Sequence, residues 1–512
     1  MLFNSLEFAF FLPIVFLLYW FLTPSGTNGP RYSLFHYWHV SEQKALRIQN
    51  AFVLIASYIF YGWWDWRFLL LIVFTSFCSW ASGLLIGNQQ TPKFWMWLNV
   101  IINLGILFTF KYYNFFVEEF CQLFPSLEGR SGGVISLILP VGISFYTFQA
   151  LSYSIDVYRQ KIEPTKDIIA LFAFIAFFPQ LVAGPIERAT NLLPQFLQNR
   201  KFSYDQATDG MRQILWGLFK KIVVADNCAT YVDQVWATYG TQTGSTLLLA
   251  AVLFTFQIYG DFSGYSDIAI GTAKLFGIKL MRNFNNPYFS RDIAEFWRRW
   301  HISLTTWFRD YVYIPLGGSR PEVPAHIQNP DRYKKLIIIR NTFVIFLLSG
   351  FWHGANWTFI AWGAYHALLF LPLILLGKNR KYTNQVAEGR LLPTWKESGQ
   401  MLFTFALVVL GWIIFRAPHM PTLLHYLEGM FQWGTLRASY RFFLPDENLV
   451  WPTNILIIIM LLVEWFQRNK QHGLEVIDAR KYKWLRVACY YVLILFIISN
   501  AGTEQTFIYF QF

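Results

Sequence analysis

One titratable side chain, His353, stands near the middle of the apolar and aromatic stretch FVIFLLSGFWHGANWTFIAWGAY (343–365). Burial lowers the pKa of a histidine, so an imidazole in such a stretch stays neutral at pH 7 and can accept a proton as a general base. The alternative is a core histidine whose ring nitrogens are satisfied by neighbouring groups. The rest of the chain has to decide between these two interpretations.

A second group of reactive side chains lies in NFNNPYFSRDIAEFWRRWHISLTTWFRDYVYIPLGGSR (283–320). Asn-Asn-Pro marks a turn, and Ser290 has the position of an N-cap, so the sequence predicts one helix over about 291–310. Its aromatic residues do not share one narrow stripe. The helix therefore either lies at the membrane surface or packs inside the protein with its guanidinium groups toward an anionic ligand or lipid phosphates. The basic residues concerned are Arg298, Arg299 and Arg309.

Two carboxylates, Asp261 and Asp267, interrupt the apolar segment YGDFSGYSDIAIG (259–271). A carboxylate inside a membrane is costly, so it usually lines a cavity or pairs with a base. The structural alternative is that these side chains hold helix ends or pair with a nearby arginine. Asp261 is thus a candidate for either a site or an internal ion pair.

The elements that must position these groups are membrane helices. The 512-residue chain is 55% hydrophobic and 14% charged, whereas a soluble domain carries about 25% charged residues. Apolar runs close to the length that spans a bilayer recur throughout. The sequence predicts an all-α polytopic integral membrane protein with about 11–13 membrane-embedded helices. The runs cover roughly 5–23, 50–63, 67–87, 95–110, 134–155, 167–184, 211–225, 246–273, 336–352, 356–376, 399–416, 453–466 and 485–500.

The net charge of +12 comes from basic residues between the apolar runs. This distribution is typical of cytoplasmic loops and does not indicate nucleic-acid binding. The stretch 24–49 carries Arg31, Lys44 and Arg47 against Glu42. It is therefore expected in the cytoplasm, which places the N-terminus outside.

No internal repeat or separate soluble domain is evident, so the whole chain, 1–512, is expected to form a single membrane domain. Within it, 274–340 is a basic and aromatic region that contains His301, and 341–376 forms the helices that carry His353. The four cysteines are far apart and show no metal-ligand spacing. No metal site is therefore expected.

Three stretches together resemble the membrane-bound O-acyltransferase (MBOAT) family. They are FFPQLVAGPIER (177–188), the block from 283 to 318, and SGFWHGANWTFIAWGAYHALL (349–369). Within the family, they are most similar to the bacterial members that modify alginate and teichoic acid. The resemblance also covers 140–159 and the terminal FIYFQF, and it implies a ring of helices around a central cavity.

The resemblance assigns roles to individual residues. His353 in WHGANW matches the catalytic position, and His301 in WHISLTTW (300–307) matches a second position that would orient or polarise the acyl group. A thioester-to-hydroxyl transfer needs a base for the hydroxyl proton, which is the role expected of His353. Further candidates for contacts to substrate or donor are Arg298, Arg299, Arg309, Trp352, Asn356 and Asp261.

The expected activity is transfer of an acetyl group from a cytoplasmic thioester donor, acetyl-CoA, across the bacterial inner membrane. The acetyl group would serve O-acetylation of an exopolysaccharide, either alginate-like or another cell-surface glycan. The resemblance implies a periplasmic or surface acyltransferase as partner, within a polysaccharide-synthesis complex in the lipid bilayer. It implies no resident cofactor and no nucleic-acid partner.

Three other functions remain open at this stage. A D-alanyl or longer acyl group is the chief rival to acetyl within the same enzyme class. A polysaccharide transporter would also need many helices and intramembrane polar groups, although two similar half-chains would be expected. A scaffold of a polymer-synthesis complex is the third possibility.

His366 is a further histidine in this region. It follows His353 by 13 residues, which in an unbroken helix corresponds to a turn of about 220°. A packing role on the far side of the helix is therefore expected for it.

Overall fold

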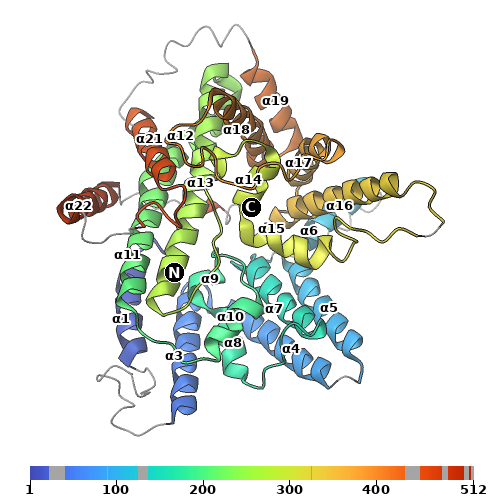
Figure 1. Cartoon of the computed structure of the whole chain (residues 1–512), viewed down its shortest axis with the longest axis vertical. Coiled ribbons are helices and arrows are strands. Elements are labelled where there is room, and N and C mark those ends of the chain that lie inside the picture. Colours follow the sequence, from blue (N-terminus) through green and yellow to red (C-terminus); the bar gives the residue numbers. More distant parts are fainter. Residues whose placement is uncertain are drawn as a thin grey trace. The chain divides into compact units, whose positions relative to one another are not determined.

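The structure is a computed structural model that describes residues 1–21, 41–88, 90–124, 137–324, 326–432, 450–475, 482–500 and 507–508. All regular elements in these residues are helical (Figure 1), which confirms the all-α prediction. A helix satisfies its backbone hydrogen bonds internally, as a segment inside a bilayer must. Arg31, which entered the prediction of orientation, lies outside the described residues.

The chain divides into two compact units, and the first comprises Met1–Ile214 and Tyr265–Met281. Small and polar side chains join its helices: Ser154 Oγ accepts a hydrogen bond from Asn99 Nδ2 at 2.7 Å and lies 3.0 Å from Ser82 Oγ. Such residues let membrane helices approach closely. Its helices are α1 (Leu6–Phe21), α3 (Glu42–Gly62), α4 (Leu69–Gly87), α5 (Pro92–Lys111), α6 (Tyr113–Leu123), α7 (Ile143–Tyr158), α8 (Ile168–Ala176), α9 (Phe178–Leu181), α10 (Ala189–Phe196) and most of α11 (Tyr204–Leu218).

The second unit comprises Leu215–Gly264 and Arg282–Phe512. Helix α13 (Gly244–Leu275) contributes residues to both units. A π-helix, η3 (Phe219–Ala225), links α11 to α12 (Asp226–Ala237). The further helices of this unit are α14 (Ile293–Arg299), α15 (Ile302–Phe308), the π-helix η6 (Arg309–Tyr313), α16 (Pro330–His353), α17 (Trp357–Leu375), α18 (Trp395–Arg416), α19 (Met420–Met430), α21 (Val450–Phe466) and α22 (Lys483–Asn500).

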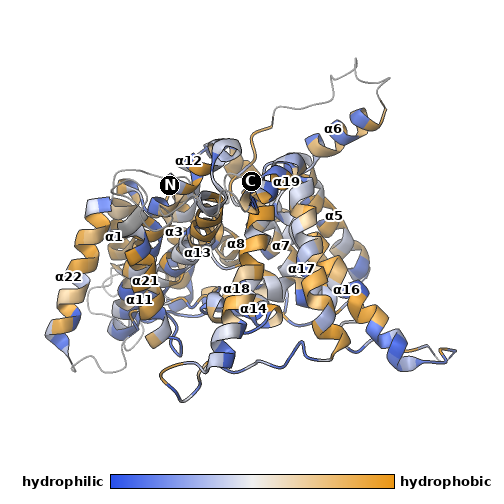
Figure 2. Ribbon diagram, turned by 90° about the horizontal axis from the view of Figure 1, so that it is seen from above, coloured by the Kyte–Doolittle hydropathy of each residue, from blue (hydrophilic) through white to orange (hydrophobic). Residues whose placement is uncertain are grey.

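Seven helices in the described part of the chain are long and apolar enough to cross a membrane. Figure 2 shows hydrophobic residues along α17 and α22, with hydrophilic residues at the N-terminal turns of α16. None of the residues of α22 is buried in the protein, and so large an apolar surface is expected only against another protein or lipid. The seven spans are Trp66–Gly87, Pro92–Lys111, Gly244–Leu275, Pro330–His353, Trp357–Leu375, Trp395–Arg416 and Lys483–Asn500.

Capping residues set the start of the helices around the two histidines. Asn356 accepts a hydrogen bond from the backbone N–H of Thr358 and caps α17. Thr394 and Glu397 form a reciprocal capping box at the start of α18. These caps satisfy backbone donors that a helix leaves free at its first turn, so the position where each helix begins is defined by its own sequence.

The prediction of one continuous helix over 291–310 was wrong. The chain forms α14 and α15 with a break at Trp300 and His301, and the N-cap of α14 is Asp292, not Ser290. His301 has φ 42° and ψ 55°, a left-handed conformation that is uncommon for any residue other than glycine. The break therefore coincides with one of the two histidines expected to do chemistry.

Candidate active site

A cavity of about 650 Å³ lies within the second unit. It is enclosed by residues of α14, α15, η6, α16 and α17, together with 379–383 from the segment after α17. Both His301 and His353 line it. The structure thus brings together the two histidines that the sequence placed 52 positions apart, in a volume typical of sites that bury small ligands.

Backbone hydrogen bonds hold His301 in its left-handed conformation. The N–H of Ile302 donates to the carbonyl of Asn283 at 2.9 Å, and the N–H of Asn285 donates to the carbonyl of Arg299 at 2.9 Å. The 283–285 segment therefore grips the chain on both sides of the histidine. Strained backbone conformations persist where surrounding contacts over-determine them, and they cluster at functional sites.

The hydrogen bonds of His301 assign its tautomer. Asn283 Oδ1 lies 3.1 Å from His301 Nδ1 and also accepts from the hydroxyl and the backbone N–H of Ser303. A backbone N–H only donates, so the atom facing it is the amide oxygen, and Nδ1 of the neutral ring must carry the proton. The other nitrogen, Nε2, is buried and has no hydrogen-bond partner among the described residues.

Burial also determines the charge of His301. Its side chain is 1% exposed, and desolvation lowers its pKa from 6.5 to about 3. The ring is therefore neutral at physiological pH, and its Nε2 offers a lone pair to whatever occupies the cavity.

His353 is the last residue of α16, and aromatic rings hold it in place. Its ring centroid lies 5.2 Å from that of Trp362 and 5.1 Å from that of Phe415, with nearly perpendicular planes. Gly354 follows because a Cβ at that position would lie 2.3 Å from the ring of Phe359. The HGAN sequence thus ends one helix, lets an aromatic ring approach and caps the next helix.

The ring of Trp352 packs against both histidines, with its centroid 6.1 Å from that of His301 and 4.9 Å from that of His353. Neither Trp352 nor Asn356 is among the residues that line the cavity. Asn356 donates to the carbonyl of Pro418 at 2.6 Å in addition to capping α17. The contacts of Asn356 are those of a residue that positions the helix carrying Trp362, whereas Trp352 contacts both imidazoles.

The three arginines predicted to hold a donor have different surroundings. Arg298 lines the cavity, but its guanidinium donates to the backbone carbonyls of Asn379 and Tyr382. Arg299 does not line the cavity and bonds Glu295. Arg309 lines it, is 57% exposed and pairs with the adjacent Asp310. Arg309 is therefore the member of the three best placed to meet an incoming anion.

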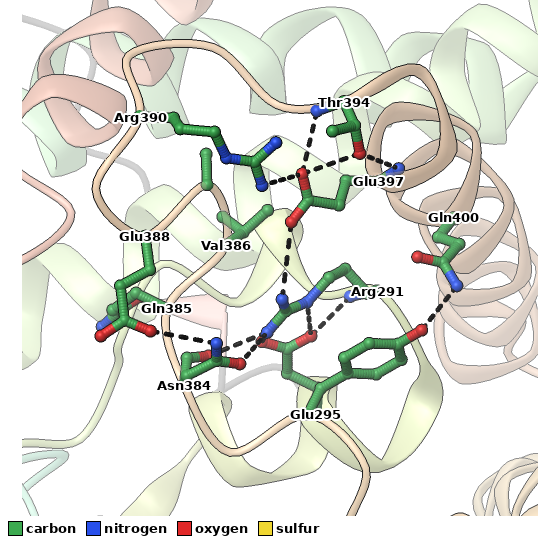
Figure 3. Close-up of polar contacts among 12 residues, drawn as sticks. Arg291, Glu295, Asn384, Gln385, Val386, Glu388, Arg390, Thr394, Glu397 and Gln400 are labelled. Carbon is green, nitrogen blue, oxygen red and sulfur yellow. Dashed lines mark hydrogen bonds and ion pairs between the residues drawn. The ribbon is translucent and has the colours of Figure 1, made fainter.

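Arginine side chains also hold the segment 379–390, whose residues 379, 380 and 383 line the cavity. Figure 3 shows Arg291 between the carboxylate of Glu295 and Asn384, with Glu397 on its other side. We refer to 379–390 as the arginine-held segment. The backbone carbonyls that accept from Arg291, Arg298, Arg299 and Arg468 are those of Asn379, Tyr382, Asn384, Val386, Ala387 and Arg390.

The arginine-held segment brings a cation to the cavity that the sequence analysis missed. Arg380 lines the cavity beside Asn379 and Thr383. The available signal was the basic run KNRK (378–381) that directly follows α17. Asn283, which orients His301, was also missed, although it opens the block that contains His301.

Asp261 does not line the cavity. Its carboxylate forms an ion pair with Lys221 at 2.8 Å, so Asp261 belongs to an internal ion pair, with a lysine in place of the arginine expected. Asp267 belongs to the first unit and accepts a hydrogen bond from Gln213. Neither carboxylate is placed to contact a ligand in the cavity.

His366 is buried against aromatic rings and is absent from the cavity lining. Trp297 Nε1 donates to its Nδ1 at 3.4 Å. The unbroken helix assumed for the angular argument does not exist, because α16 ends at His353 and α17 begins at Trp357. The contacts themselves are those of a packing residue.

The fold and this site agree with one class of protein. A model of the membrane-bound O-acyltransferase family matches residues 159–396, and a relative that is 39% identical covers 86% of this chain. The chain belongs to the membrane-bound O-acyltransferase family. It is a multi-pass membrane protein and an acyltransferase, as the resemblance implied.

Named relatives extend this result. The chain is 39% identical over 444 residues to a probable alginate O-acetylase AlgI of Pseudomonas aeruginosa, which covers 86% of this chain and 76% of that protein. It is 31% identical to a peptidoglycan O-acetyltransferase of Helicobacter pylori, over 100% of this chain and 98% of the relative. A teichoic acid D-alanyltransferase of Streptococcus thermophilus is 28% identical over 59% of this chain.

Proposed function

We propose that this acyltransferase moves an acetyl group from acetyl-CoA in the cytoplasm across the bacterial inner membrane for O-acetylation of an exopolysaccharide. The observation that carries the proposal is that His301, at the break between α14 and α15, and His353, at the end of α16, line the same cavity. Relatives named as O-acetylases match a larger share of the chain, at higher identity, than the D-alanyltransferase does. Acetyl is therefore favoured over D-alanyl, and alginate or a similar glycan is the proposed polymer.

The proposed step is attack of an acceptor hydroxyl on the carbonyl carbon of the thioester. The oxygen forms a new C–O bond as His353 takes the hydroxyl proton, and the C–S bond breaks. The leaving thiolate then recovers the proton from the imidazolium, which restores His353 for the next cycle. The rings of Trp362 and Phe415 pack edge-on against the imidazole of His353 and hold it in place for this step.

His301 has a different role in this proposal. Polarising an acyl carbonyl requires a donor, whereas the bond to Asn283 leaves Nε2 of the neutral ring as an acceptor. His301 therefore orients the reaction by accepting a hydrogen bond from the acceptor hydroxyl or from an amide N–H of the donor. This arrangement supports positioning over polarisation of the acyl group.

The donor phosphates are proposed to bind at the part of the cavity lined by Arg309 and Arg380. Arginine suits phosphate because its planar guanidinium can form two parallel hydrogen bonds. Arg298 and Arg299 support this part of the site indirectly, by holding the arginine-held segment. No resident cofactor is required, because acetyl-CoA is consumed as a substrate.

The orientation follows from the basic 24–49 stretch, which is proposed to be cytoplasmic, with the N-terminus on the outer side. The acyl group is passed to the periplasmic side of the inner membrane. A separate periplasmic or surface acyltransferase, in a complex with the polysaccharide-synthesis machinery, completes the modification. The names of the polymer-modifying relatives support this context.

The test is the O-acetyl content of the exopolysaccharide in cells that express His353→Ala or the wild type at matched membrane levels. We expect loss of acetyl esters with normal polymer yield. His425→Ala is a matched control, because His425 lies on the exposed side of α19 and does not line the cavity. Its acetylation should equal that of the wild type.

Each outcome of this test is decisive. Unchanged acetylation in His353→Ala would refute the proposed base. Lost export of the polymer, with acetylation of the residual polymer intact, would identify the protein as a transporter or scaffold. If the wild-type polymer carried D-alanyl esters and no acetyl esters, the transferred group would be D-alanyl.

A further inference from the structure

A buried cluster of charged side chains from η3, α12 and α13 lies outside the cavity. Lys221 Nζ lies 2.8 Å from Oδ1 of Asp226 and 2.8 Å from Oδ1 of Asp261. All three side chains are at most 6% exposed. Charges at such depth are costly unless they are paired, and they usually have a specific task.

Close backbone approach makes this cluster possible. A Cβ at Gly260 would lie 2.9 Å from the carbonyl oxygen of Lys220, and one at Gly264 would lie 2.7 Å from that of Gly217. The two glycines therefore let α13 pack directly on the π-helix. Isolated π-helical turns are frequent at functional sites, and this one turns Lys221 toward Asp261.

The second oxygen of Asp261 holds the C-terminal part of the chain. Oδ2 accepts a hydrogen bond from the backbone N–H of Ile508 at 2.7 Å. Phe507 and Ile508 are each 1% exposed. The charged cluster thus anchors a segment that is almost 250 positions away from Asp261 in sequence.

Anchoring this segment completes a row of rings that ends at His301. The ring centroid of Phe507 lies 6.0 Å from that of Phe262, the residue directly after Asp261. Phe262 is fully buried, and its ring meets the imidazole of His301 edge-on at 4.7 Å. The carboxylate of Asp261 therefore holds residues 507–508, which we call the tail. The ring of Phe262 lies between the tail and His301, so it transmits the position of the tail to the imidazole.

We infer that Lys221 and Asp261 are positioning residues, which orient His301 by anchoring Phe507 and Ile508 behind Phe262. The ion pair acts on the backbone of the tail, Phe507 closes the space behind Phe262, and Phe262 fixes one side of the imidazole. Asn283 fixes the hydrogen-bonding side of the same ring. This inference rests on the role proposed above for His301.

The test uses membrane vesicles that carry the complete system, with radiolabelled acetyl-CoA as the probe and acetyl incorporated into polymer as the readout. For Phe507→Ala we expect kcat to fall by about ten- to a hundredfold, since small misplacements of catalytic groups have effects of this size. The KM for acetyl-CoA should not change. Phe507→Leu should recover most of kcat, because it refills the space behind Phe262.

The link between carboxylate and tail is tested by a double-mutant cycle. Asp261→Asn should lower kcat, and the Asp261→Asn/Phe507→Ala variant should be no slower than the slower single variant. Lys220→Met is the matched control, because Lys220 lies in the same π-helix but its ammonium contacts Ser263 and Glu464. It should lower the melting temperature while kcat is retained.

Wild-type kcat in Phe507→Ala, or multiplicative losses in the double variant, would overturn the inference. A loss of kcat in Lys220→Met equal to that in Asp261→Asn would show that the effect is general destabilisation, which also overturns it. His301→Ala separates this inference from the proposed function. If His301→Ala has normal kcat, the role proposed for His301 is refuted. If His301→Ala loses kcat while Phe507→Ala keeps it, only the positioning inference is refuted.

Discussion

Nδ1 of His301 lies 3.1 Å from the side-chain oxygen of Asn283, and this relationship determines which nitrogen of the ring is available for chemistry. The same oxygen accepts from Ser303, so the imidazole must donate to it. The buried Nε2 is left as an acceptor. The tautomer of His301 therefore depends on the amide of Asn283, and its neutral charge depends on burial.

Burial of His301 predicts a specific pH dependence of stability. The pKa of this group is about 3 in the native protein and about 6.5 in the unfolded chain, so the unfolded chain binds the proton first as the pH falls. The free energy of unfolding should therefore decline as the pH falls from about 6.5 toward 3. His301→Gln should reduce that decline, as measured by melting temperatures of the detergent-solubilised protein across this range.

Asn283→Asp is the control for this prediction. A carboxylate beside Nδ1 raises the pKa of His301, because it stabilises the imidazolium. The variant should lose less stability than the wild type as the pH falls through the same range. Identical pH profiles for the wild type and His301→Gln would contradict the prediction.

Glu295 should be a major contributor to stability. It is 1% exposed and accepts hydrogen bonds from Arg291 and Arg299, which are themselves buried. Replacing it with Gln removes the carboxylate that pairs with Arg299 and leaves Arg291 with Glu397 alone. Breaking a buried pair costs about 3–5 kcal/mol. We expect a marked drop in melting temperature.

The control for Glu295 is the exposed ion pair of Asp65 and Arg67, whose guanidinium is 63% exposed. Surface ion pairs contribute about 0–1 kcal/mol. Asp65→Asn should therefore melt close to the wild type. Equal shifts for the two variants would refute the special importance of Glu295.

Gly350 should tolerate no larger residue. A Cβ there would lie 2.2 Å from the carbonyl oxygen of Phe359, so alanine would force α16 and α17 apart one turn before His353. We expect Gly350→Ala to lower both the melting temperature and acetyl transfer, with a destabilisation of about 1–3 kcal/mol.

Gly399 provides the matched substitution, because a Cβ there meets nothing within 4 Å. It lies inside α18, where alanine is favoured over glycine by about 0.5–1 kcal/mol. Gly399→Ala should be neutral or stabilising and fully active. Destabilisation of both variants by the same amount would point to a general intolerance of alanine.

Arg380 should contribute to donor binding. Hydrogen bonds to charged groups contribute about 1.5–3 kcal/mol, so Arg380→Gln should raise the KM for acetyl-CoA by about tenfold or more with little change in kcat. The effect should shrink as salt is added, because this cation is exposed to solvent.

Lys381→Gln tests whether the effect is specific to the cavity. Its ammonium lies over the ring of Tyr382 and the residue does not line the cavity. Its KM should match that of the wild type. If both variants raised the KM equally, Arg380 would act only through general attraction of the anionic donor and would have no specific contact with it.

The sequence predicts the helices well where length and composition decide. The apolar runs around α4, α5, α16, α17 and α18 needed no tertiary information, because only a helix satisfies the backbone over such a length. The predicted 291–310 helix failed for a tertiary reason. Hydrogen bonds from 283–285 impose the break at His301, and local propensity contains no trace of them.

The candidate site shows the same division. The types of its residues were visible in the sequence, and both histidines do line one cavity. The partners of its charges were not visible. Arg298 and Arg299 bond the arginine-held segment and Glu295, and Asp261 pairs with Lys221, 40 positions earlier. Charge can be read from a sequence, but the distance to its partner depends on the fold.

The arginine-held segment is gripped through its main chain. Guanidinium groups bond carbonyl oxygens, which every residue type supplies, so the hold does not depend on the identity of most side chains in 379–390. Evolution can therefore exchange the side chains at 380 and 383 while the wall keeps its place. Substitutions at these positions would therefore change the lining of the cavity and leave the framework intact.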